Sequence, residues 1–175
     1  MIVRRACCWL LVGLSLAPAG CATTKKQKSR EAVEAEVTES FVRLQAAIDE
    51  LRKGETENLW DLLAERSVDE ATKKAKAFRA DFAKRDKEEQ EEIAQELGAT
   101  ADEIRDKLSP YGYFRIQRNK IYERYLMVVA AEVDHVKLAG DEATVYYVAD
   151  ETNRDKKPID FVREDGRWRA ILSIP

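Results

Sequence analysis

The residues of this sequence best suited to acid–base chemistry are Asp134 and His135, in a stretch that alternates like a β-strand. An aspartate or histidine can act as a general base while a tyrosine hydroxyl stabilises the developing charge, as in enolisation or hydrolysis. The tyrosines that could supply the hydroxyl are Tyr122, Tyr125, Tyr146 and Tyr147. Neighbouring residues of a regular strand point to opposite faces, so Asp134 and His135 can share a pocket only if a β-bulge intervenes. We therefore expect no catalytic pair here.

Large aromatic side chains could line a ligand pocket, although the same residue types more often fill a core. The pocket candidates are Trp60, Tyr125, Tyr147 and Trp168. Phosphate-loop, dinucleotide-binding, serine-nucleophile and zinc-protease motifs are absent from the sequence. With three cysteines and one histidine in the chain, we predict neither a metal site nor a cofactor.

Cys21 is the residue for which the sequence predicts a specific modification. Arg4 and Arg5 precede an apolar run from Ala6 to Ala17, and small residues then lead to Cys21. Such a run, if helical, would span only about 18 Å, whereas the hydrocarbon core of a bilayer is about 30 Å thick. The run is therefore typical of a signal peptide and too short for a permanent membrane span.

Residues 18–21, Pro-Ala-Gly-Cys, resemble the lipobox of bacterial lipoproteins, with Pro18 where an aliphatic residue is usual. The alternative is an ordinary secretory signal that is cut nearby. The resemblance implies cleavage before Cys21 and its acylation, with chains such as palmitate holding the protein in the cell envelope. Ala22 is not the aspartate that typically retains enteric lipoproteins in the inner membrane. The resemblance therefore favours the periplasmic leaflet of the outer membrane.

Removal of residues 1–20 as a signal peptide changes the composition that is left. Two of the three cysteines are removed, so Cys21 is the one cysteine of the mature chain and a disulfide within it is excluded. Two arginines leave as well, and the formal net charge shifts from −3 to −5, which argues against a nucleic-acid partner. Residues 21–30 are then a lipidated, flexible, basic tether that can touch anionic lipid, and residues 31–175 are a single domain.

The first part of this domain has the apolar spacing of helices. Six apolar residues from Val33 to Leu51 share one face of a helix that Gly54 ends. A short helix over ENLWDLL follows, and Ser67 with Glu70 matches the capping box of a third helix. The charged run at 84–92 is typical of a solvated helical face, and it could also meet a partner.

The middle of the chain gives mixed signals. Thr100 and Glu103 match a second capping box, and the Ser-Pro-x-Gly sequence at 109–112 is expected to break the chain. The aromatic stretch at 114–125 suits a helix and would also suit a strand. From about Met127 the pattern becomes that of β-strands.

Four strands joined by short turns are predicted in the last part of the chain. Asp165 and Gly166 are typical of a tight hairpin turn, because glycine tolerates a positive φ there. Apolar residues alternate from Trp168 to Ile174 in the last strand, and Ile171 on its other face indicates that this face is partly covered. Helices followed by an antiparallel sheet predict an α+β fold.

This order of elements resembles the nuclear transport factor 2-like superfamily, and within it small bacterial envelope lipoproteins. The likeness rests on GETENLWDLL at 54–63 and on the VREDGRW hairpin at 162–168, and it extends over roughly residues 33–174. It implies a cystatin-like α+β cone, in which a curved sheet wraps around helices and leaves a concavity at its open end. The helical insert at 67–108 is longer than the family minimum. Members include enzymes, binding modules and proteins with filled cones, so the fold does not select the function.

We expect a non-enzymatic, lipid-anchored module that faces the periplasm and binds a small apolar ligand or an envelope protein. One alternative is an isomerase- or hydrolase-like enzyme that uses Asp134 or His135 with a tyrosine. Another is a scaffold lipoprotein whose charged helix between Ser67 and Leu97 meets a partner. A closed cone filled by aliphatic side chains would overturn the enzyme alternative, and an Asp134 buried beside a tyrosine hydroxyl would restore it.

Overall fold

A computed structural model describes residues 28–149 and 156–175, in which helices precede a four-stranded antiparallel sheet. The predicted α+β class is therefore confirmed. The predicted signal peptide, Cys21 and most of the tether lie outside the described residues. Within the described part, no helix has both the length and the apolar character that a membrane crossing requires.

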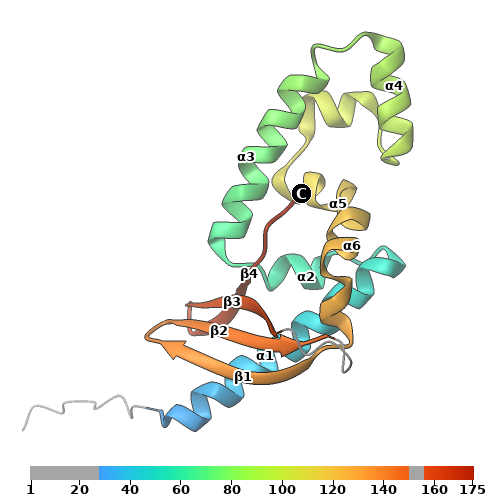
Figure 1. Cartoon of the computed structure of the whole chain (residues 1–175). Helices are drawn as coiled ribbons and strands as arrows, with labels where there is room; N and C mark the ends of the chain where they lie inside the picture. Colours follow the sequence, from blue (N-terminus) through green and yellow to red (C-terminus); the bar gives the residue numbers. More distant parts are fainter. Residues whose placement is uncertain (1–27, 150–155) are drawn as a thin grey trace, which may run out of the picture.

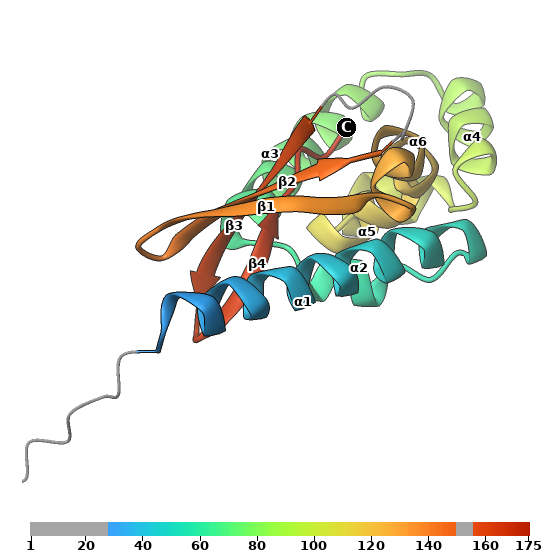
Figure 2. The same cartoon turned by 60° about the horizontal axis from the view of Figure 1, so that its bottom comes forward.

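The first helix, α1 (Arg30–Glu50), carries the apolar face that its spacing predicts. The hydroxyl of Ser29 caps it by accepting a hydrogen bond from the Ala32 N–H at 3.2 Å. A 3-10 turn, η1 (Leu51–Lys53), follows, and Gly54 ends it with a φ of 87°. Figure 2 shows α1 running across one face of the sheet. The buried large side chains of this face are Val37, Phe41, Leu44, Ile48 and Leu51.

After the short helix α2 (Glu57–Asp61), helix α3 (Glu65–Phe82) begins two residues before the predicted Ser67. Its first N–H, on Glu65, donates to both carboxylate oxygens of Glu164 at 3.1 Å each. The predicted capping box is therefore wrong. Ser67 lies buried inside the helix, and its hydroxyl accepts from a main-chain N–H 105 residues further along.

Glu164→Ala is expected to lower the free energy of unfolding by about 1 kcal/mol, because the first turn of α3 loses the carboxylate that accepts from its N–H. Urea denaturation followed by circular dichroism measures the change. Glu142→Ala, at an exposed strand end, is the matched control and should leave stability almost unchanged. Equal effects of the two substitutions would contradict the capping role.

The charged run forms the start of a separate helix. The chain turns after α3, and the carboxylate of Asp86 caps α4 (Lys87–Glu96) by accepting from the Glu89 N–H at 2.9 Å. A helical and largely exposed face is therefore confirmed for residues 87–92, whereas residues 84–86 of the charged run lie in a turn that breaks the helix expected to continue to Leu97.

The second capping box is confirmed. The Thr100 N–H donates to Glu103 Oε2 at 2.9 Å, and the Glu103 N–H donates to Thr100 Oγ1 at 3.2 Å. The helical turn that follows, η2 (Glu103–Lys107), has π-type hydrogen bonding. It brings Ile104 back toward the end of α3, where this residue is fully buried.

Residues 78–108 form an arm that projects beyond the sheet (Figure 1). The arm has a small core of its own, in which Phe82, Ala94 and Ile104 are buried. Phe78 and Leu108 pack against both this core and the main core, and they join the arm to the rest of the domain.

The predicted break is confirmed at Leu108 and Ser109, which separate η2 from the next helix, but Pro110 and Gly112 already lie inside that helix. Ser109 caps α5 (Pro110–Ile116) by accepting from the Gly112 N–H at 2.9 Å, and Pro110 stands in the first turn, where its missing N–H costs nothing. A second helix, α6 (Arg118–Val129), continues past Met127. The β region therefore begins later than predicted, because an apolar helical face extends through Val128.

The sheet has the order β1-β2-β3-β4 with every pair antiparallel. Asp165 and Gly166, with φ values of 50° and 77°, form the predicted turn between the last two strands. The outer edge of the last strand is paired as well, since Ala170 exchanges hydrogen bonds of 2.8 and 2.9 Å with the segment at 62–64. The strands are β1 (Glu132–Ala139), β2 (Glu142–Val148), β3 (Lys156–Glu164) and β4 (Arg167–Ile171).

Candidate functional site

The interior between the sheet and α1 is filled by side chains, two of which are pocket candidates. Tyr147 is 6% exposed, and its ring centre lies 5.7 Å from that of Phe41. Trp168 is 5% exposed on the same inner face of the sheet. Trp60 packs edge-on against Phe114, with ring centres 5.2 Å apart, and is partly buried. These three aromatic residues therefore serve as core.

The buried polar side chains of the described residues are uncharged: Thr56, Ser67, Gln90 and Gln117. No carboxylate, imidazole or cationic group of the described residues belongs to the buried class. An enclosed acid–base pair of the kind needed for enolisation is therefore not found in this part of the chain.

Asp134 and His135 do lie on the same face, because a β-bulge interrupts the register between Val133 and His135. Asp134 is the extra residue of the bulge, and its Oδ2 lies 2.5 Å from His135 Nδ1 and 2.7 Å from Lys156 Nζ. The ring of Tyr146 stacks on the imidazole, with centres 4.5 Å apart and planes 8° apart. A bulge therefore does bring Asp134 and His135 to one face, as a shared pocket would require, but this is the outer face of the sheet.

This outer-face cluster of Asp134, His135, Tyr146 and Lys156 is open to solvent. The side chains of His135 and Asp134 are 50% and 29% exposed. Hydrogen bonds from Lys156 and then from His135 hold the pKa of the Asp134 carboxyl below its ordinary value. Asp134 is thus kept ionised and orients the imidazole, but no surrounding wall excludes water from the pair.

Lys156→Gln is expected to raise the pKa of Asp134 toward its ordinary value, since the largest cause of the depression is lost. A depressed folded-state pKa stabilises the fold above the unfolded-state pKa, and this contribution is lost as the pH falls through the folded-state pKa. Carboxyl-carbon NMR titration of Asp134 measures the midpoint. Lys157→Gln is the matched control and should leave it unchanged. The same midpoint in all three proteins would contradict the assigned cause.

The larger surface hollow lies where the arm meets α5 and α6. It has a volume of about 590 Å³ and is lined by arm residues such as Leu97 and Glu103 on one side and by Arg115 and Arg118 on the other. A second hollow of about 490 Å³ lies beside α2 and is lined by Tyr111 and Arg115 among others. The walls of both mix polar and apolar atoms, and neither is lined by a pocket candidate. Two further hollows of about 330 Å³ each are lined in part by Tyr125 and by Trp168.

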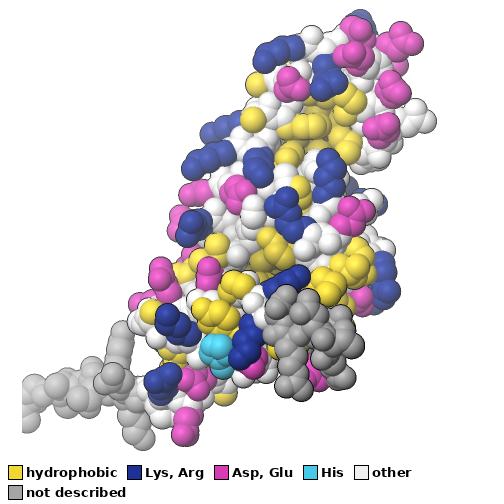
Figure 3. Space-filling view, viewed as in Figure 1, with side chains coloured by type: hydrophobic (Ala, Val, Ile, Leu, Met, Phe, Trp, Pro, Cys, Tyr) yellow, Lys and Arg dark blue, Asp and Glu magenta, His cyan; other side chains and the backbone are white. Residues whose placement is uncertain are grey.

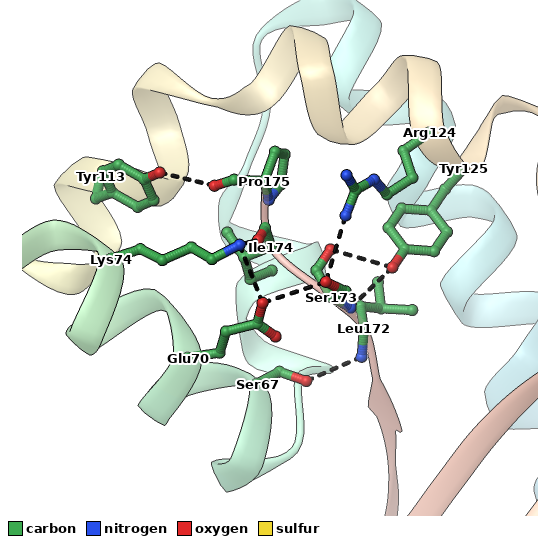
Figure 4. A network of polar contacts seen from close by, with 10 residues as sticks. All are labelled: Ser67, Glu70, Lys74, Tyr113, Arg124, Tyr125, Leu172, Ser173, Ile174 and Pro175. Carbon is green, nitrogen blue, oxygen red and sulfur yellow. Dashed lines mark hydrogen bonds and ion pairs between the residues drawn. The ribbon is translucent and has the colours of Figure 1, made fainter. Parts of the chain in front are cut away.

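Tyr125, the remaining pocket candidate, belongs to a network that the sequence analysis missed (Figure 4). Its hydroxyl accepts from the Ser173 N–H at 2.8 Å and donates to the Ser173 carbonyl at 3.1 Å. Residues 172–175, here called the strap, leave the sheet after β4 and run between α3 and the α5–α6 pair. The last strand was predicted to continue to Ile174, but β4 ends at Ile171. The apolar alternation that continues through Leu172 and Ile174, both buried, was the available signal for the strap.

No group of three metal-ligating side chains occurs among the described residues. Comparisons with protein-family models, with curated proteins and with solved structures find no match to this chain.

Proposed function

We propose that this chain is a lipid-anchored, non-enzymatic protein-binding module of the bacterial cell envelope. The anchor is assigned to acylated Cys21, with residues 21–30 as the tether and the periplasmic leaflet of the outer membrane as the location. The fold is assigned to the nuclear transport factor 2-like cone, on the support of a first helix packed across a sheet that ends in the hairpin at 162–168. The filled interior favours a protein over a small apolar ligand.

The observation that carries the binding proposal is the incomplete core of the arm. Three buried residues form this core, and six further apolar residues around it stay partly exposed. Partly exposed apolar side chains gain free energy, about 25 cal/mol per Å², when another surface removes them from water. The six are Phe78, Ile93, Leu97, Ala99, Ala101 and Leu108.

Charges of opposite sign flank this apolar surface on its two sides and could orient a bound partner. Figure 3 shows hydrophobic side chains between α3 and α4, with Lys and Arg gathered over α3 and Asp and Glu over α4. Helix α4 contains five glutamates and one lysine. Complementary charges select partners and fix their orientation more than they raise affinity. The arm therefore suits a partner with an apolar contact flanked by charges of both signs, which includes the scaffold role considered above.

Photo-crosslinking in the native envelope tests the arm. A photoreactive residue at Glu92, exposed on α4, should give one discrete protein adduct, whereas the same residue at Glu142, at an exposed strand end, should not. Leu97→Asp should abolish the Glu92 adduct while the protein stays folded by circular dichroism. Val42→Asp, at an apolar α1 residue that is 55% exposed, is the matched control and should retain it. An adduct that survives Leu97→Asp would contradict the proposal.

Cys21→Ser is expected to abolish labelling by an alkyne analogue of palmitate and to move the protein from the membrane fraction to the soluble fraction, because the thiol that carries the lipid is gone. Cys8→Ser is the matched control, since Cys8 lies in the proposed signal peptide and its loss should leave labelling intact. A Cys21→Ser protein that still takes up the label and sediments with membranes would refute the anchor.

A second candidate, an isomerase- or hydrolase-like enzyme, has one specific observation in its favour. The bulge places Asp134 and His135 on one face and holds the imidazole against the carboxylate. An aryl-ester hydrolysis assay tests it, and activity that is lost in His135→Gln but kept in Lys137→Gln would support it. Activity that is unchanged by His135→Gln would exclude this pair.

A further inference from the structure

Side chains of three helices hold the strap after it leaves the sheet (Figure 4). Ser67 and Lys74 come from α3, Tyr113 from α5 and Tyr125 from α6. We call these four residues the slot. An extended segment that leaves a sheet normally loses its ladder partners, and here the slot side chains replace them.

The slot contacts main-chain atoms of the strap. Besides the two Tyr125 bonds to Ser173, Ser67 Oγ accepts from the Leu172 N–H at 2.9 Å. Lys74 Nζ donates to the Ile174 carbonyl, and Tyr113 Oη donates to the Pro175 carbonyl at 2.7 Å. Five main-chain groups on four consecutive residues are thereby satisfied. Contacts of this kind recognise an extended backbone and place few demands on its side chains.

The side chains of the strap supply the selectivity. Ile174 is fully buried and Leu172 is 1% exposed, whereas Ser173 between them is exposed. The Ser173 hydroxyl donates to Glu70 at 3.2 Å and accepts from Arg124 at 3.3 Å. The groove in which the strap lies, formed by the slot residues and their neighbours, therefore fits a large aliphatic residue, a small polar residue and a second large aliphatic residue in succession.

Release of the strap would leave the ladder of the sheet paired, although it would expose Leu172 and Ile174, which belong to the main core. The last ladder pair of β4 is Asp160 with Ile171, so rotation about the backbone between residues 171 and 172 releases the strap and leaves the strands paired. The slot would keep its donors after such a release. Burial raises the pKa values of Tyr113 and Tyr125 while the strap is seated. An unburied tyrosine hydroxyl is also protonated near neutral pH, so both hydroxyls can donate after a release.

We propose that the slot is a peptide-binding site, filled in cis by the strap, whose ligand in trans is an extended segment of a partner protein with two large aliphatic residues flanking a small polar one. The chemistry of this ligand follows from the observed occupant: five satisfied main-chain groups, two aliphatic sockets and one hydroxyl-binding position. The site goes beyond the proposed function, because its hydrogen-bonding groups are not part of the apolar surface of the arm. The two surfaces meet where the ring of Tyr113 packs against Phe78, with ring centres 5.8 Å apart, but their tests use different residues and either can fail alone.

Peptide capture by the full-length lipidated protein in detergent tests the slot. The probe is a fluorescein-labelled peptide with the sequence of residues 169–175, followed by fluorescence anisotropy. Ile174→Asp prevents the protein's own strap from seating, and this variant should bind the probe at least tenfold more tightly than the unaltered protein does. A peptide with serine in place of both Leu172 and Ile174 should bind at least tenfold more weakly.

A second substitution assigns the binding to the slot. Adding Tyr125→Phe to Ile174→Asp should weaken capture at least fivefold, because the hydroxyl that contacts both main-chain groups of the central residue is lost. Adding Tyr122→Phe, on the same helix, is the matched control and should not. A folded Ile174→Asp protein that captures no peptide, or both peptides equally, would overturn the proposal. A concentration-dependent dimer without capture would also overturn it, in favour of strap exchange between copies.

Hydrogen exchange on the unaltered protein keeps the proposal testable if Ile174→Asp does not fold. Excess probe peptide should accelerate exchange of the Leu172 and Ser173 amides in proportion to its concentration, because it traps the state in which the strap is released. The serine-substituted peptide should have no effect. Rates that do not change with the probe peptide would overturn the proposal.

Discussion

Phe41→Ala is expected to lower the free energy of unfolding by about 3–5 kcal/mol, the range for removing a large aromatic side chain from a packed core. Phe41 is fully buried in α1 and packs against Tyr147 on the inner face of the sheet. Its loss leaves a cavity between two elements that are far apart in the sequence. Urea denaturation followed by tryptophan fluorescence measures the change, because Trp168 is buried in the main core and Trp60 packs against it.

Val42→Ala provides the matched control for this prediction. Val42 is the next residue of the same helix, but its side chain is 55% exposed. We expect a change within about 0.5 kcal/mol, as for surface positions in general. If both substitutions cost the same, the apolar face of α1 would not be the face that packs on the sheet.

Local spacing was sufficient to predict α1 and the last hairpin. In α1 each large buried residue follows the previous one by three or four positions, and one face of the helix meets one sheet. Asp165 and Gly166 form the tight turn that their positive φ values allow. In both cases the residues that determine the structure are neighbours in the sequence.

The start of α3 was not predictable in this way, because its partners lie about 100 residues away. Ser67 and Glu70 match a capping box, yet Ser67 binds the strap and Glu164 of the last hairpin accepts from the first N–H of the helix. The contact of Ser67 with the strap also belongs to the slot. Neither the start of α3 nor the slot was therefore predicted from local spacing. A local motif indicates which side chains can form hydrogen bonds, and the tertiary fold determines which partners they bond to.

The outer-face cluster shows how one extra residue changes the argument about chemistry. Regular alternation predicts that Asp134 and His135 face apart, and the bulge turns both to the outer face. A bulge leaves little trace in a single sequence, because it changes the register without changing the residue types. The sequence could therefore identify the two residues but not the face on which they meet.

Phe82→Ala is expected to unfold the arm while the sheet stays intact. Phe82 is 1% exposed at the end of α3, and its cluster contains only two other buried residues, Ala94 and Ile104. A loss of about 3–5 kcal/mol exceeds what so small a core can supply. Hydrogen exchange should therefore show lost protection across α4 and η2 and retained protection across β2 and β3.

Lys84→Ala, at an exposed position in the turn after α3, is the control and should leave protection of the arm unchanged. A uniform loss of protection in Phe82→Ala, sheet included, would show that the arm and the sheet unfold as one unit through Phe78 and Leu108. If the arm unfolds alone, the same variant separates the two proposed surfaces. The crosslink from Glu92 should then disappear, whereas an added Ile174→Asp substitution should still allow the slot to capture its peptide.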